Sequence, residues 1–137
     1  MNFKIKIRQG QVRKVGISGV RAKSLMKSGV LAIKTARIIP FNEFSLKSIL
    51  RELYEGLREY IEGLGYMRGY KFLDHESITY FLRDVLEEEL ISKKFDRYRK
   101  LRNGINYYGN DLEVETVKLA IEEIPLIIKK LKDKYNN

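Results

Sequence analysis

A short stretch in the C-terminal part of the chain carries the side chains best suited to chemistry. Within residues 95–110, two arginines and two asparagines share one side of an expected helix: Arg99, Arg102, Asn103 and Asn106. This set is unusual, because a solvated helix face normally mixes Lys with Glu. Guanidinium and carboxamide groups suit phosphate oxygens or a symmetric polar interface. The alternative interpretation is a helix whose arginines are simply solvated.

Most other catalytic chemistries are disfavoured by composition. The chain has one histidine, His75, and no cysteine, which argues against a Ser-His-Asp triad, a Cys-His dyad or a zinc site of several histidines. It also has no P-loop and no dinucleotide-binding fingerprint. We therefore predict no metal site and no cofactor. His75 precedes Glu76 at the start of an expected helix, and we interpret it as a capping or packing residue in preference to a general base.

Helical periodicity predicts the element that positions the arginines. Apolar side chains in the same stretch recur at steps of three and four and are expected to face a core: Tyr98, Leu101, Ile105 and Tyr108. Gly109, followed by Asn110, is typical of a helix C-terminus. An acidic run at residues 87–89 is expected to precede a break near Ser92, after which this helix begins.

Four further helices are predicted around it. The first runs from Ser18 to about residue 39, and the second covers residues 45–65, with Ser45 as N-cap and a hydrophobic staple between Phe44 and Ile49. A third begins at Asp74. The last begins at Asp111 and contains Pro125, where we expect a kink or a break.

The N-terminal segment has a different pattern. Residues 1–16 alternate apolar and basic side chains, which predicts a short strand, a hairpin through Gln9-Gly10 or an extended arm. The fold class expected is all-α, an up-and-down bundle of about five helices with a short extended or β N-terminal arm. A basic arm at residues 1–16 and one helical-bundle domain at residues 17–137 are the expected organisation, since 137 residues suffice for one core.

The positive charge is concentrated in one part of the chain. Residues 1–42 contain ten Lys or Arg and no acid, whereas residues 43–137 contain 17 basic and 18 acidic residues, so the net charge of +9 belongs to the N-terminal third. Such asymmetry favours a polyanionic partner, most often nucleic acid. The alternative is a general contribution to solubility.

Three absences indicate a cellular location. The chain has no cysteine, no apolar run of membrane-spanning length and no apolar core of a signal peptide near its N-terminus. We therefore expect a cytoplasmic protein without a membrane partner.

A resemblance to a known family follows from the central motif. The pattern Arg97-x-Arg99-x-x-Arg102-Asn103-x-Ile105-x-Tyr107, before the last long helix of a small bundle, resembles a HEPN domain. The motif of that family is Arg, usually followed by Asn, and then His after four to six residues. The sequence Arg-Asn-Gly-Ile-Asn-Tyr-Tyr-Gly is similar to that of small archaeal HEPN-like proteins of unassigned function.

The resemblance implies a range of activities. HEPN proteins are typically homodimers in which the Arg and His of both subunits converge on a cleft. Many are metal-independent ribonucleases, several of them toxins in toxin-antitoxin systems. Others are non-catalytic proteins that bind RNA or a nucleotide, often as partners of a minimal nucleotidyltransferase.

This sequence departs from the motif at the histidine. With four residues between it and Arg102, the corresponding position holds Tyr107, and with six residues between it and Arg99, it holds Asn106. A tyrosine with a pKa of about 10 is ionised in roughly one molecule in a thousand at neutral pH, so it is a poor general base unless its pKa is lowered. The groups that would hold a phosphate are present, and the group that would move a proton is missing.

Three hypotheses follow. The leading one is a homodimeric module that binds RNA or a nucleotide through five residues: Arg99, Arg102, Asn103, Asn106 and Tyr107. The second is a metal-independent ribonuclease in which Arg102 acts with Tyr107, or with His75, in place of the missing histidine. The third is a purely structural interaction module, in which Arg102 and Asn103 brace a dimer interface.

Overall fold

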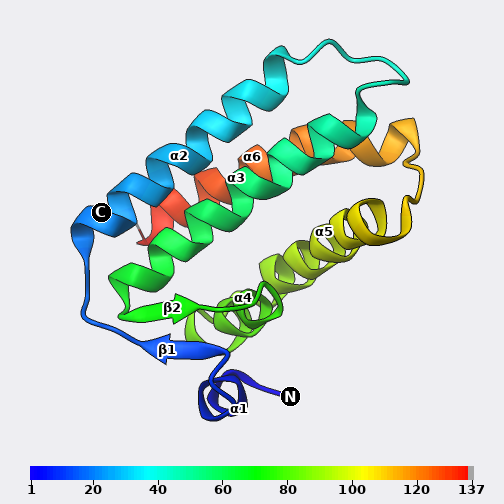
Figure 1. Ribbon diagram of the computed structural model, residues 1–137. Helices are drawn as coiled ribbons and strands as arrows, with labels where there is room; N and C mark the ends of the chain where they lie inside the picture. Colours follow the sequence, from blue (N-terminus) through cyan, green and yellow to red (C-terminus); the bar gives the residue numbers. More distant parts are fainter. Residues whose placement is uncertain (136–137) are drawn as a thin grey trace.

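The computed structural model describes residues 1–135 as a bundle of long helices with a two-stranded sheet at one end (Figure 1). Helices α2 (Gly19–Ile38) and α3 (Leu46–Met67) lie side by side, and α3 also packs against α5 (Glu89–Tyr108) and α6 (Val114–Tyr135). The predicted fold class is therefore confirmed. The last two residues of the predicted domain, 136–137, lie outside the described part. In residues 1–135, no helix combines the length and the apolar character needed to cross a membrane.

Glycines set the spacing between α2 and α3. A Cβ on Gly29 would lie 2.6 Å from the carbonyl oxygen of Gly56, and a Cβ on Gly56 would lie 2.7 Å from that of Gly29. Near the other end of the pair, a Cβ on Gly63 would lie 2.8 Å from the carbonyl oxygen of Ala22. No side chain fits at these distances, so the two backbones approach each other directly. Because α3 lies at the centre of the bundle and packs closely against α2, almost none of its apolar surface is exposed.

Several predicted helix ends are confirmed. Ser18 caps α2, its side-chain oxygen accepting a hydrogen bond from the Arg21 N–H at 3.2 Å. Asp74 caps α4 (Glu76–Tyr80) by accepting from the Ser77 N–H at 2.8 Å. Gly109 ends α5 in the left-handed region, with φ of 64°.

Other predicted details are wrong. The Ser45 side chain does not cap α3, because its hydroxyl donates to the carbonyl oxygen of Pro40 and accepts from the Asn42 N–H. Phe44 is 87% exposed, so the hydrophobic staple does not form. Tyr108 is 79% exposed, because the last turn of α5 extends beyond the core.

The boundaries of the last helices also differ from the prediction. The break before α5 lies at residues 86–88 instead of near Ser92. Glu88 in this break is buried, and Lys134 and Tyr135 donate hydrogen bonds to its carboxylate. Helix α6 begins at Val114, not at Asp111, and continues through Pro125 without a break.

The N-terminal segment differs most from the expectation. Its first part forms a short helix, α1 (Phe3–Arg8), in which Phe3 and Lys6, three residues apart, share the buried side. A strand remains only in β1 (Val12–Lys14), which pairs antiparallel with β2 (Tyr70–Phe72). Asn2 caps α1, and Phe3 packs against aromatic rings of the bundle, so tertiary contacts decide the conformation.

Helix α4 continues directly into a π-helical turn, η1 (Phe81–Val85). The Lys6 ammonium lies 3.2 Å from Asp74 and 2.7 Å from Glu76. This pairing joins α1 to the start of α4.

The close glycine contact yields a stability prediction. Gly56→Ala places a methyl group 2.7 Å from the Gly29 carbonyl oxygen and 2.8 Å from Cδ1 of Ile33, so α2 and α3 must separate. We expect the free energy of unfolding in urea to fall by about 1–3 kcal/mol. Gly19→Ala is the matched control, because its Cβ meets nothing within 4 Å, and we expect no loss there. Equal stability of the two variants would contradict the close packing.

Candidate functional site

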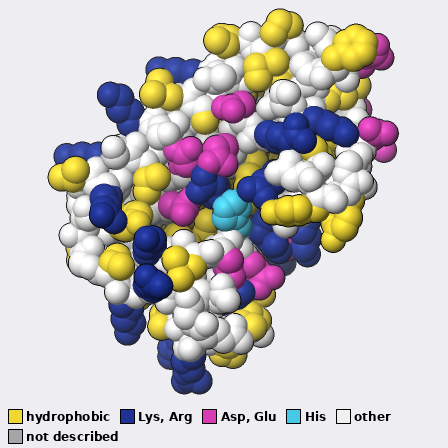
Figure 2. All heavy atoms as spheres, viewed as in Figure 1, with side chains coloured by type: hydrophobic (Ala, Val, Ile, Leu, Met, Phe, Trp, Pro, Cys, Tyr) yellow, Lys and Arg dark blue, Asp and Glu magenta, His cyan; other side chains and the backbone are white. Residues whose placement is uncertain are grey.

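The histidine lies against a buried tyrosine near the middle of one face of the molecule (Figure 2). His75 Nδ1 is 3.0 Å from the hydroxyl oxygen of Tyr54, which is fully buried on α3. The ring therefore packs, as predicted, but does not cap α4, since Asp74 fills that role. Within residues 1–135, His75 Nε2 has no hydrogen-bond partner.

The proton on the histidine has two possible arrangements. If the Tyr54 hydroxyl donates to Nδ1, the neutral ring carries its proton on Nε2 and presents a donor. If Nδ1–H donates to the phenol oxygen, Nε2 is free to act as a base. Burial raises the pKa of Tyr54 well above its usual value, with Arg102 opposing the shift, so the phenol stays protonated at neutral pH.

Arg102 lies over the same tyrosine. Its guanidinium carbon is 5.3 Å from the centroid of the Tyr54 ring, a cation–π arrangement. Its Nη1 donates to Oδ1 of Asn103 at 3.1 Å. In the described part of the chain, no carboxylate lies within ion-pair distance of Arg102, although its side chain is partly buried.

The neighbouring arginines are already neutralised. Arg99 donates two hydrogen bonds to Asp96, at 2.7 and 3.0 Å, so this predicted ligand-binding residue has a carboxylate of its own. Arg58 on α3 pairs with Glu55 and Glu62. Both arginines still act on the histidine through their charge, without being free to bind an anion.

Arg51 extends the site along α3. Its Nε donates to Oδ1 of Asn106 at 2.8 Å, which joins α3 to α5 near the predicted polar stripe. Across residues 1–135, Arg51 has no ion pair with a carboxylate. Arg51 and Arg102 are thus two cations without counter-charges on the facing sides of these helices.

Tyr107 is not part of this cluster. A step of five residues turns about 140° around an α-helix, so Tyr107 cannot share the direction of Arg102. Its side chain is 70% exposed. Of the predicted site residues, the structure brings together Arg102, Asn103 and Asn106, pairs Arg99 with an acid, and places Tyr107 apart.

Residues of α3 are the part of the site that sequence reasoning missed. Arg51, Tyr54 and Arg58 follow one another at steps of three and four, which is the spacing of one helix face. This signal was available in the sequence, but it is hidden among the leucines of a strongly amphipathic helix. The approach of His75 to this face has no sequence signal, because it depends on the packing of α4.

Charge and burial set the protonation of the histidine. Burial lowers the pKa of His75 to about 4, and the positive charges of Arg58 and Arg102 act in the same direction. Glu55 opposes the shift, and Arg99 adds a smaller lowering. The imidazole is therefore neutral at neutral pH. Among the described residues, no group of three or more His, Asp or Glu side chains could hold a metal ion.

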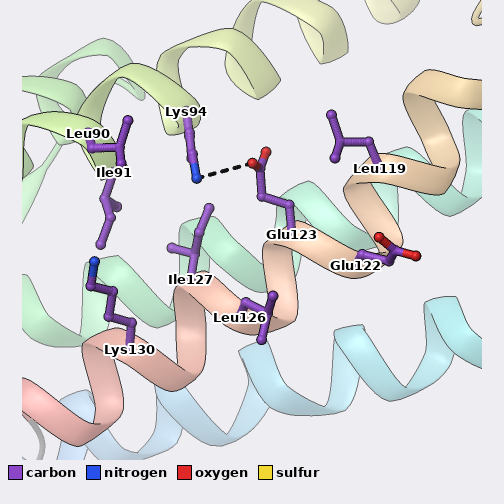
Figure 3. A pocket seen from close by; sticks show the side chains of 9 residues that line it. All are labelled: Leu90, Ile91, Lys94, Leu119, Glu122, Glu123, Leu126, Ile127 and Lys130. Atoms are coloured by element: carbon purple, nitrogen blue, oxygen red, sulfur yellow. Dashed lines mark ion pairs between the residues drawn. The ribbon is translucent and has the colours of Figure 1, made fainter.

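A second hollow lies between α5 and α6 (Figure 3). Its lining includes three exposed leucines, Leu90, Leu119 and Leu126. Lys94 of α5 reaches across it to Glu123 of α6 at 3.2 Å. Glu123 also accepts from the hydroxyl of Tyr98 at 2.6 Å, so its carboxylate is held by both helices.

No model of a known protein family matches this chain, and neither a curated protein nor a solved structure shows significant similarity to it. The HEPN resemblance therefore rests on the motif and the helical layout alone.

The state of the histidine can be measured directly. Because His75 is the only histidine, its Cε1–H resonance can be followed by NMR without ambiguity. We expect a titration midpoint near 4, and a higher midpoint in Arg102→Ala because one positive charge is removed. Lys118→Ala, at an exposed position on α6, should leave the midpoint unchanged.

The same shift sets the pH dependence of stability. An unfolded histidine has a pKa of about 6.5, so between about 6.5 and 4 the unfolded chain binds a proton that the folded chain does not. The contribution of His75 therefore lowers the stability of the folded state as pH falls through this range. A midpoint of 6.5 in the folded protein would contradict the described environment.

Proposed function

We propose that the facing sides of α3 and α5 bind a phosphate group of RNA or of a nucleotide. The observation that carries the proposal is Arg102, a partly buried guanidinium with no carboxylate partner in residues 1–135. A partly buried cation without a counter-charge is unfavourable, and an anionic ligand would relieve that cost.

The surroundings of Arg102 favour an anion of this kind. Tyr54 and Asn103 fix its guanidinium, so binding would cost little side-chain entropy. Arg51 supplies a second cation, and its contact with Asn106 ties it to the same helix pair. With Nδ1 accepting from Tyr54, His75 would offer Nε2–H as a further donor. Arginine donors in a fixed orientation are well suited to phosphate oxygens.

The proposal also covers the oligomeric state, the cellular location and the protein partners. The HEPN resemblance supports a homodimer with a minimal nucleotidyltransferase as its partner, and a chain free of cysteine fits a cytoplasmic location. The exposed leucines of the α5–α6 hollow, Leu90, Leu119 and Leu126, support a protein contact on that side of the molecule. A purely structural role remains the competing hypothesis.

The binding proposal predicts a specific loss. Arg102→Ala should weaken the binding of a fluorescein-labelled four-nucleotide RNA, measured by anisotropy, about 10- to 100-fold, which is the typical effect of a charged hydrogen bond. The matched control is Arg97→Ala on the same helix, whose guanidinium also lies over a tyrosine but pairs with Glu123. Equal affinity of Arg102→Ala and wild type, or a change in sedimentation alone, would favour the structural role.

Ribonuclease activity is a second candidate, and the position of His75 favours it. In the arrangement with Nδ1–H donating to Tyr54, Nε2 is a free base on an imidazole that contacts the same tyrosine as Arg102. It would accept the proton of an RNA 2′-hydroxyl as the 2′-oxygen forms a bond to phosphorus. The P–O5′ bond would break, and the leaving oxygen would take a proton from water. Arg102 would offset the negative charge on the phosphorus oxygens.

This candidate predicts cleavage that depends on His75 and not on Tyr107. Total RNA should be cleaved in the presence of EDTA by wild type and by Tyr107→Phe, but not by His75→Gln or Arg102→Ala. We expect Tyr107→Phe to cleave RNA like wild type, because Tyr107 is exposed and lies apart from the cluster. Loss of cleavage in Tyr107→Phe would assign the proton transfer to the tyrosine, and no cleavage by wild type would leave a binding site only.

A further inference from the structure

A strip of cations without counter-charges follows α1, β1 and α2. Ten Lys or Arg lie in residues 1–42, and every one except Lys6 is exposed and has no ion pair within the described chain. We call these nine residues the basic strip: Lys4, Arg8, Arg13, Lys14, Arg21, Lys23, Lys27, Lys34 and Arg37. Figure 2 shows Lys and Arg side chains along the edge that these elements occupy in Figure 1.

The cations of residues 43–137 differ from those of the basic strip. Most Lys and Arg of residues 43–137 have a carboxylate within 4.0 Å, including exposed ones such as Lys93, Lys118 and Lys129. A general solubility charge would not separate the two populations in this way. The mutual repulsion of the basic strip is uncompensated in the free protein, so a bound polyanion would relieve it.

The arrangement along α2 fits a linear polyanion. Lys23, Lys27, Lys34 and Arg37 follow one another at steps of four, seven and three, which keeps them on one side of the helix. At 1.5 Å per residue they extend over about 21 Å, a length along which a nucleic acid strand presents several phosphates. Lys4 of α1 and Lys14 of β1 line a hollow together with Tyr70, and Asp84 also lines it.

We propose that the basic strip binds the sugar-phosphate backbone of a nucleic acid strand. The inference rests on the proposed function, in which the ligand is RNA or a nucleotide. It adds that the ligand is a polynucleotide and not a mononucleotide. The strip supplies contacts that depend on length and salt but not on sequence, whereas Arg102 holds one phosphate.

The test compares two variants of equal charge. The strip variant carries Lys23→Gln, Lys27→Gln, Lys34→Gln and Arg37→Gln. The control carries Lys93→Gln, Lys100→Gln, Lys118→Gln and Lys129→Gln, which removes four exposed cations that have carboxylate partners. Each set lowers the formal net charge by four, from +9 to +5. Labelled oligouridine RNAs of four and 24 nucleotides, and DNA of the same lengths, are titrated at several salt concentrations.

The expected result is a loss confined to long strands. The strip variant should bind the 24-nucleotide strand about tenfold or more weakly, and its slope of log affinity against log salt should fall by up to about 3, at about 0.7 per single-strand phosphate contact. The control variant should retain most of the affinity. RNA and DNA should respond alike if only the backbone is read, and a larger effect on RNA would assign the ligand to RNA.

The outcomes separate this inference from the proposed function. Suppose that Arg102→Ala binds the four-nucleotide RNA weakly, while both charge variants bind the 24-nucleotide strand equally well. This result would overturn the proposal for the strip and retain the proposal for the Arg102 site. The reverse pattern would retain the strip and overturn the site. An equal loss in both charge variants would mean that net charge alone attracts the strand, and stronger binding to polyglutamate or to phosphatidylserine vesicles than to either nucleic acid would overturn the inference.

Discussion

The close approach of α2 and α3 at Gly29 and Gly56 is the constraint on which the other arrangements depend. Each glycine leaves room for the carbonyl oxygen of the other helix, at distances that exclude a side chain. Because α2 buries only a narrow inner face, in which small residues such as Ala22 and Ala36 alternate with Met26 and Ile33, its remaining surface is free for charge. Helix α3 is thereby held in the middle of the bundle, with another of its sides turned toward α5.

Tyr54 connects the packing of α3 to the candidate site. It is a core residue by burial, and its ring packs 5.6 Å from that of Phe95 on α5. The same ring lies beneath the Arg102 guanidinium, and its hydroxyl meets His75 at the start of α4. One buried aromatic side chain therefore links three helices and places a cation beside a neutral imidazole. A fixed ring of this kind orients both groups more firmly than surface side chains could be oriented.

The molecule holds its positive charge in two environments. On α5 and α6 most cations lie within reach of carboxylates, as in the pairs Arg99–Asp96 and Lys94–Glu123. Along α1, β1 and α2 the cations lack such partners in the described chain, apart from Lys6. Arg51 and Arg102 also lack a carboxylate partner in the described chain, although they lie between α3 and α5. The proposals for the site and for the strip both arise from this uneven neutralisation.

Local patterns in the sequence determined the helices, the Ser18 cap, the Gly109 stop and the placing of Arg102 and Asn106 on one side of α5, because these depend on residues three or four apart. The pairing of Arg99 with Asp96 has the same local spacing and could also have been anticipated. Only the tertiary structure decided that residues 3–8 are helical, because Phe3 is held by rings distant in the chain. It alone brought His75, Tyr54 and Arg102 together, since no local pattern relates side chains on three separate helices.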